Sequence, residues 1–147
     1  MCQNYAKCEL KKIHDYERRI AILDKEVACL KDKANSSTAP ISGNGGGSSK
    51  ANDKLGEYVP KYVDMEAMRD VLAVEAEKHR RKCFNLINSL TKVIYTDVLY
   101  ARYFENKSFV EISDEFGYSE RNVGYIHCYA LKELNEILKG ENTNVTC

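Results

Sequence analysis

Apolar residues recur at alternating steps of three and four along the first part of the chain, and this spacing restricts it to helical packing. The row consists of Ile13, Tyr16, Ile20, Leu23, Val27 and Leu30. A mean step of about 3.5 residues is the period of a coiled-coil seam, so residues 1–34 are predicted to form one amphipathic helix. β-Branched residues alternate mostly with leucines, an order that favours a parallel dimer. Because the row is short for an autonomous coiled coil, a helix of the same chain is an equally good partner for it.

A second helical row begins after a stretch rich in Gly, Ser and Asn. Residues 35–52 are predicted to be a flexible linker, because Gly and Ser at this density do not hold a helix. Residues 53–90 are predicted to be a second long helix whose continuous part starts at Pro60, since proline is tolerated in the first turn. Its apolar row is made of Leu72, Ala76, His79, Cys83, Leu86 and Leu90. Two such helices joined by a flexible link predict an antiparallel hairpin, a coiled-coil dimer, or both in one bundle.

Two polar features stand out in the second helix. His79 lies on the apolar row, and we expect a polar core residue rather than a metal ligand, because no second ligand stands four residues away. Arg80, Arg81 and Lys82 form a compact basic cluster. These three cations are candidates for a DNA phosphate contact or for an acidic protein surface, and the alternative is a solvated helix face.

Composition favours a cytoplasmic protein over a secreted or membrane protein. The six Cys residues include no Cys-x-x-Cys pair, the start has no apolar signal region, and no apolar run approaches the length of a membrane span. We therefore expect reduced thiols in a bacterial host cytoplasm, no membrane contact, no metal and no other cofactor. We also expect no enzyme, because the adjacent His127 and Cys128 point about 100° apart on a helix and do not form a nucleophile–base pair.

Residues 91–140 carry the start and stop signals of three further helices. The first is predicted over Thr91–Phe104, and Asn106 after it tolerates the left-handed backbone that ends a helix. Ser108 and Glu111 have the spacing of a capping box, in which each side chain bonds the backbone N–H of the other. A short second helix is therefore predicted to start after Ser108.

The third of these helices is predicted to start after a short turn. Gly117 is expected to end the second helix, because glycine adopts positive φ without steric cost. Ser119 is expected to cap a third helix that runs to about Leu138, with Gly140 stopping it and residues 141–147 as a tail. Its inward side is predicted to consist of Val123, Ile126, Ala130 and Leu134. A helix, a Gly-containing turn and a capped helix follow the order of a helix-turn-helix unit, whose last helix enters the major groove.

The early residues of this last helix point outward in that geometry and form the candidate DNA-binding site. They are Ser119, Glu120, Arg121, Asn122, Gly124 and Tyr125. Arg suits the edge of guanine and Asn the edge of adenine, each through paired hydrogen bonds. Tyr125 can reach a phosphate or a thymine methyl group, and Gly124 leaves a gap where a side chain would otherwise read a base.

The same residues carry a family resemblance. The stretch Tyr103–Val123, followed by residues 130–134, resembles region 4 of bacterial sigma factors, whose last helix reads the −35 promoter element. Its anchors are Glu111-Ile112, Gly117-x-Ser119, Val123 and Ala130-Leu131-x-x-Leu134. The resemblance implies base-reading roles for Glu120, Arg121, Asn122, Gly124 and Tyr125. The whole chain is similar to small phage and prophage transcription regulators of Gram-positive bacteria.

The sequence departs from a typical sigma factor in two ways. A typical sigma factor is richer in Arg in this helix, and it carries upstream regions that melt promoters. The chain is therefore not expected to be a complete sigma factor on its own. The expected fold is all-α, with an N-terminal long-helix hairpin or coiled coil joined to a C-terminal helix-turn-helix similar to sigma region 4.

The expected function is that of a phage-type DNA-binding transcription regulator. Its partners would be double-stranded DNA, a second copy bound through the N-terminal helices, and as a further candidate RNA polymerase. Residues 91–147 carry six Lys or Arg against nine Asp or Glu residues, a net charge of −3. This balance weakens nonspecific attraction to phosphates. The alternative is a protein-interaction module that docks on RNA polymerase or another regulator without binding DNA.

Overall fold

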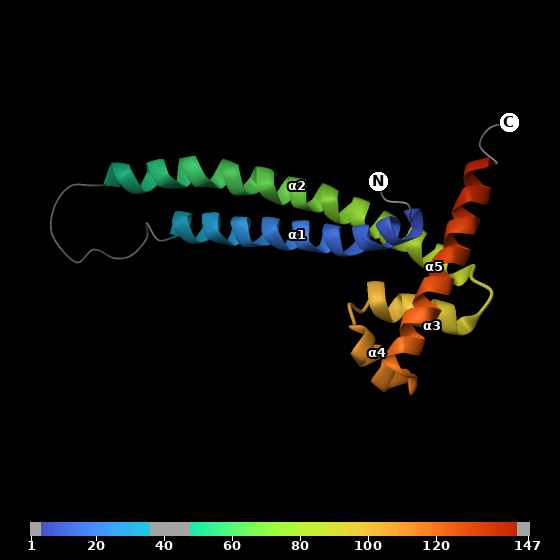
Figure 1. The fold of residues 1–147 in the computed structure, drawn as a ribbon. Coiled ribbons are helices and arrows are strands. Elements are labelled where there is room, and N and C mark those ends of the chain that lie inside the picture. Colours follow the sequence, from blue (N-terminus) through green and yellow to red (C-terminus); the bar gives the residue numbers. More distant parts are fainter. Residues whose placement is uncertain (1–3, 36–47, 144–147) are drawn as a thin grey trace. The chain divides into compact units, whose positions relative to one another are not determined.

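The computed structural model describes residues 4–35 and 48–143, and within them every regular element is a helix. Five helices follow one another along the described chain: α1 Tyr5–Asn35, α2 Ser48–Asn88, α3 Val93–Tyr103, α4 Phe109–Phe116 and α5 Glu120–Thr143 (Figure 1). The expectation of an all-α fold is confirmed. None of these helices combines the length and the apolar character needed to cross a membrane.

The chain divides into two compact units. One unit comprises Tyr16–Glu75, and the other comprises Met1–Asp15 together with Ala76–Cys147. Both long helices contribute to each unit. We refer to Tyr16–Glu75 as the hairpin unit and to the other as the bundle unit.

In the hairpin unit, α1 and α2 run side by side in opposite directions (Figure 1). Salt bridges join them from Lys31 Nζ to Glu66 and from Arg69 Nε to Asp24 Oδ1, the latter at 2.8 Å. Of the apolar row on α1, Val27 is buried in this unit, whereas the rest of the row there is partly exposed. The chain itself therefore supplies a partner for the seam, in an antiparallel hairpin, which is one of the arrangements expected from the sequence.

The boundaries of α2 correct two sequence-based expectations. The helix starts at Ser48, not at residue 53, and it continues through Pro60. The last part of the predicted linker, residues 48–52, is thus helical, while residues 36–47 lie outside the described residues. A proline inside a helix removes one backbone hydrogen bond. The turns on either side nevertheless stay in register, with an ion pair of 3.3 Å between Glu57 and Lys61 spanning the proline.

The bundle unit holds the main core of the described chain. Its buried side chains come from the start of α1, the end of α2, α3 and α5. They are Ala6, Leu10, Ile13, Cys83, Leu86, Ile87, Leu90, Leu99, Tyr103, Phe104, Ala130, Leu131 and Leu134. Segments from both ends of the chain are needed to cover these side chains, so the N-terminal turns of α1 are part of the same core as α5.

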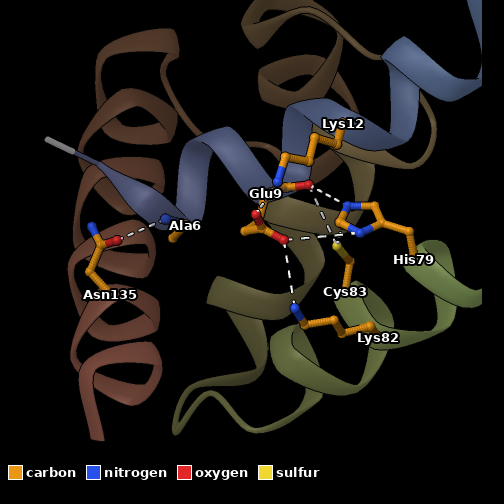
Figure 2. Close-up of polar contacts among 7 residues, drawn as sticks. All are labelled: Ala6, Glu9, Lys12, His79, Lys82, Cys83 and Asn135. Carbon is orange, nitrogen blue, oxygen red and sulfur yellow. Dashed lines mark hydrogen bonds and ion pairs between the residues drawn. The ribbon is translucent and has the colours of Figure 1, made fainter. Parts of the chain in front are cut away.

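A polar cluster around Glu9 fastens the first turns of α1 to α2. The backbone carbonyl of Glu9 lies 2.8 Å from Nε2 of His79 and accepts a hydrogen bond from Sγ of Cys83 at 3.6 Å (Figure 2). The Glu9 carboxylate lies 3.7 Å from Lys82 Nζ. Burial opposes ionisation of Glu9, but the hydrogen bond and charge of Lys12 outweigh it and lower the Glu9 pKa. His79 thus lies on the apolar row, as expected, and its partner is a backbone carbonyl.

The start of α1 is also tied directly to α5. The Ala6 backbone N–H donates to Oδ1 of Asn135 at 2.8 Å, and the Asn135 amide donates to Oδ1 of Asn4 at the same distance (Figure 2 shows the first of these bonds). The first bond satisfies one free backbone N–H in the first turn of α1, and the second holds the Asn135 amide against the Asn4 side chain.

One cysteine differs from the expectation of reduced thiols. Cys8 is disulfide-bonded, whereas Cys29, Cys83 and Cys128 are free. Cys83 is buried, and this burial raises its pKa to about 11. Within residues 4–35 and 48–143, no three His, Cys, Asp or Glu side chains come close enough together to hold a metal ion.

The short C-terminal helices begin and end largely where the sequence signals predicted. Asn106 has a φ of 56° and Gly117 a φ of 73°, and both follow the end of a helix. Ser108 Oγ accepts the Glu111 N–H at 3.3 Å, and the Glu111 carboxylate accepts the Ser108 N–H at 2.7 Å, which confirms the capping box. Gly140 does not stop α5, which runs on to Thr143. Glycine in a helix costs about 1 kcal/mol relative to alanine, and this is not enough to end it.

We predict opposite effects of alanine at two glycines of this region. Gly117→Ala should lower the free energy of unfolding by about 1–2 kcal/mol, because an L-residue is strained at positive φ. Gly124→Ala should raise it by up to about 1 kcal/mol, because Gly124 is helical and a Cβ there meets open space. Urea unfolding followed by circular dichroism measures both, and equal signs for the two variants would contradict the assigned backbone.

Candidate nucleic-acid interface

The start of α5 is held by a small apolar core that it shares with α3 and α4. Ile112 of α4 and Val123 of α5 are fully buried, and they pack in one cluster with Val98 and Ala101 of α3. Ile94, Phe109, Phe116 and Ile126 close its edges. The turn between α4 and α5 consists only of Gly117, Tyr118 and Ser119. A turn this short and a buried valine on the first turn of α5 leave the opposite side of that turn facing solvent.

The six residues predicted as the DNA-binding site lie together around this first part of α5. Ser119 immediately precedes the helix, and its Oγ accepts the Asn122 N–H at 3.1 Å, so the predicted cap is present. Glu120, Arg121 and Asn122 are exposed, Tyr125 is 49% exposed, and Gly124 is half-buried. The arrangement leaves Arg121, Asn122 and Tyr125 accessible to a partner.

Arg121 and Tyr125 form a pair on the outer face of α5. Arg121 Nε donates to the Tyr125 hydroxyl at 3.2 Å, and the guanidinium carbon lies 5.6 Å from the centre of the ring. A cation held over an aromatic ring in this way loses less freedom when it binds. The remaining guanidinium N–H groups of Arg121 can then donate to paired acceptors such as N7 and O6 of guanine.

The second group of candidate residues, the basic cluster on α2, is engaged within the chain. Arg80 stacks over the Phe104 ring at 4.8 Å. Arg81 Nη2 lies 3.6 Å from Glu77, and Lys82 Nζ lies 3.7 Å from Glu9. The protein therefore partly neutralises or shields these three positive charges, and this weakens their attraction for a phosphate.

Sequence reasoning missed the role of His127. Its side chain extends from α5 to the end of α3 and the start of α4. Nε2 lies 2.9 Å from the Tyr103 hydroxyl, and the ring centre lies 5.2 Å from that of Phe109, edge to face. Burial, with smaller contributions from the charges of Lys7 and Arg102, lowers the His127 pKa to about 4. Burial also raises the Tyr103 pKa to about 12. His127 is therefore neutral and buried, and it joins α5 to α3. Its place four residues after Val123 on the inward row was the signal that could have revealed this.

Sequence reasoning also missed an extension of the exposed face along α5. Tyr129 is 54% exposed, and Nζ of Lys132 lies 5.4 Å from the centre of its ring. Tyr125 and Tyr129 are four residues apart, and Lys132 is three residues further on. Such steps place residues on one face of a helix. The outer face therefore carries two tyrosines flanked by two cations, in the order Arg121, Tyr125, Tyr129 and Lys132, and we call these four residues the α5 row.

Three carboxylates of the C-terminal segment make contacts within the protein. Glu133 accepts the N–H and the hydroxyl of Thr91, at 2.7 and 3.1 Å. Glu105 and Glu115 both bind Lys107, whose pKa they raise through these hydrogen bonds. These contacts engage individual carboxylates, and the net charge of the C-terminal segment remains −3.

Comparison with known proteins adds no assignment. No family model matches the sequence, and no match was found among curated proteins or among solved structures.

The burial of His127 predicts a loss of stability in mild acid. Between pH 6.5 and about 4, the unfolded chain binds a proton at His127 that the folded protein excludes. The free energy of unfolding should therefore fall as the pH is lowered through this window, by at most about 3 kcal/mol. Urea unfolding at several pH values measures this fall, and His127→Gln should flatten it between pH 6.5 and about 5.5, above the range where most carboxylates titrate. A His127 imidazole that titrates at or above pH 6.5 by NMR in the wild-type protein would contradict the prediction.

Proposed function

We propose that the protein is a phage-type DNA-binding transcription regulator that recognises a short promoter-like site with the start of α5. In this proposal, α4 and α5 act as a helix-turn-helix similar to sigma factor region 4. The observation that supports it is the exposed set of Arg121, Asn122 and Tyr125 on a helix start that is fixed from behind by Val123. Recognition by side chains requires both features, because base edges are read only by groups held at fixed positions in the groove.

The proposed roles follow from the chemistry of the exposed groups. Arg121 donates two hydrogen bonds to a guanine, and Asn122 donates one and accepts one at an adenine. Tyr125 holds the guanidinium of Arg121 in place and offers its ring edge to a thymine methyl group. Gly124 has open space where a Cβ would stand, which lets the helix backbone approach the base pairs closely.

The first test is loss of specific DNA binding. Fragments of the cognate genome selected by the wild-type protein define the site, and binding is then measured by fluorescence anisotropy at fixed salt. Arg121→Ala with Asn122→Ala should weaken binding to the site by at least about tenfold, because each paired hydrogen bond contributes about 1–3 kcal/mol of discrimination. Lys25→Ala, which removes an exposed cation from the hairpin unit, is the control and should bind as the wild type does. Unchanged binding by the double variant would remove the proposed readout.

We further propose that two copies pair through the hairpin unit. An exposed apolar stripe follows α2, made of Val63, Ala67, Val71 and Val74. Beside it, a shallow groove of about 450 Å³ is lined by Leu23, Met68 and Leu72 together with Ala67, Val71 and Glu75. A two-fold axis near residue 69 would set Val63 opposite Val74 and Ala67 opposite Val71 of a second copy. The stripe is therefore self-complementary, as the interface of a two-fold dimer must be.

The dimer proposal is tested by sedimentation equilibrium. Val71→Asp with Val74→Asp should convert a wild-type dimer into a monomer, because two charges would be buried without partners. Val93→Asp replaces another exposed valine, 77% accessible and on α3, and should leave the dimer intact. Circular dichroism confirms that each variant keeps its helices. A monomeric wild-type protein at about 100 μM would overturn this part of the proposal.

A second candidate function is supported by the charge of the C-terminal segment. Its net charge of −3 suits a module that docks on RNA polymerase or another regulator without base contacts. The two candidates differ in one measurement. Binding of purified polymerase by the protein, with no shift of any genomic fragment at low salt, would favour the docking module over the DNA-binding regulator.

A further inference from the structure

We propose that Tyr129 and Lys132, in the distal half of the α5 row, bind a phosphate of the DNA backbone at the edge of the major groove. This inference rests on the proposed function and adds a second kind of contact to it. Arg121 and Asn122 would read bases, whereas Tyr129 and Lys132 would fix how deeply and at what angle α5 lies in the groove. Contacts to phosphates set the register of a protein on DNA but carry no sequence information.

The spacing along α5 separates the two kinds of contact. Lys132 lies eleven positions after Arg121, a separation of about 16 Å along the helix axis at about 1.5 Å per residue. The major groove is about 12 Å wide. A helix that places Arg121 at the base edges therefore carries Lys132 past the groove to the sugar–phosphate strand that borders it.

The row points in one direction over this length. Tyr125 and Tyr129 are separated by four residues, and Lys132 follows Tyr125 by seven, so all three share a face of the helix. On the opposite side Ala130 and Leu134 are buried in the core of the bundle unit. The side chains at 129 and 132 consequently face the same partner as Tyr125 does.

The charge of Lys132 is available to that partner. Its Nζ lies against the ring of Tyr129, and none of the ion pairs found among the described residues includes it. Glu133 is bound to Thr91, and Glu136 lies 3.3 Å from Lys139 Nζ, so the neighbouring carboxylates have other partners. By contrast, the cations at 81 and 82 on α2 are paired with carboxylates. Lys132 thus differs from the basic cluster in lying on the helix face that carries Arg121 and Tyr125.

The tyrosine contributes in two ways. Its ring holds the Lys132 ammonium close to the helix, as Tyr125 holds the guanidinium of Arg121. Its hydroxyl is an O–H donor on an exposed side chain and can bond a phosphate oxygen. A phosphate oxygen between the ammonium and the phenol would receive two donors, one charged and one neutral.

The salt dependence of binding tests this inference. The dissociation constant of the full-length protein is measured at several salt concentrations with the selected site and with an unrelated duplex. Lys132→Ala should reduce the slope of log K against log salt by about 0.9, as expected for one lost phosphate contact. It should weaken binding to both duplexes by the same factor, on the order of threefold to tenfold. Tyr129→Phe should weaken both equally as well, by a smaller factor.

Matched variants keep the inference separate from the proposed function. Lys139→Ala removes a cation that is further along α5 and already paired with Glu136, and it should leave the slope unchanged. Lys132→Arg should retain the wild-type slope. If the wild type binds its site in a salt-dependent manner and Lys132→Ala keeps the wild-type slope, the phosphate contact is wrong and the regulator remains. If Lys132→Ala lowers binding only to the selected site, Lys132 reads a base and the inference is again wrong. No DNA binding by the wild type would overturn both.

Discussion

Burial of one face of α5 is the interaction on which the rest of the structure depends. Val123, Ala130 and Leu134 are almost fully buried at successive turns of this helix, and His127 joins them as a neutral polar residue. Burying each large apolar side chain contributes about 1.5–3 kcal/mol. This continuous buried face fixes the rotation of α5 about its own axis, and the rotation decides which residues are left on the outside. The α5 row is exposed because the opposite face is buried.

His127 shows how closely the proposed site and the core are linked. The imidazole lies between Tyr103 and Phe109, so it contacts the end of α3 and the start of α4 from within α5. A smaller apolar residue at this position would leave the Tyr103 hydroxyl without its partner, and burying an unpaired hydroxyl is costly. The residue next to it, Cys128, is exposed on the other side of the helix. Neighbours in sequence therefore have separate roles, one in packing and one at the surface.

Contacts between distant parts of the chain complete the bundle unit. Asn135 accepts a hydrogen bond from the Ala6 backbone N–H in the first turn of α1, and the His79 ring contacts the Glu9 carbonyl of α1 (Figure 2). These bonds connect residues that are 129 and 70 positions apart. The first satisfies a backbone N–H that has no partner within α1, and the second adds a side-chain contact to a carbonyl inside α1. The core around α5 therefore includes both long helices. A substitution in the first turns of α1 would consequently disturb the packing of the helix that carries the α5 row.

The sequence by itself determined the local structure of this protein. Ser108 with Glu111 specified a helix start, and Gly117 a helix end, because capping and positive φ depend only on residues within one turn. The apolar spacing indicated the extent of the first helix and its buried side, because the period of the spacing follows from local helical geometry. The limits of such signals appear at Pro60 and Gly140, where a helix continues because local preferences of about 1–3 kcal/mol are weaker than the surrounding helix and its packing.

Only the tertiary structure decided which partners these helices meet and which charges remain available. The seam of α1 was compatible with a second chain or with the same chain, since a coiled-coil pattern describes a surface and not its partner. The cluster of Arg80, Arg81 and Lys82 suggested a basic patch, yet folding brings Phe104 to Arg80 and Glu9 to Lys82. Lys132 carried no such signal, and the contact of the neighbouring Glu133 with Thr91 exists only because α5 packs as it does. Contacts between residues far apart in sequence depend on the whole fold, so they cannot be derived from the periodicity of any one segment.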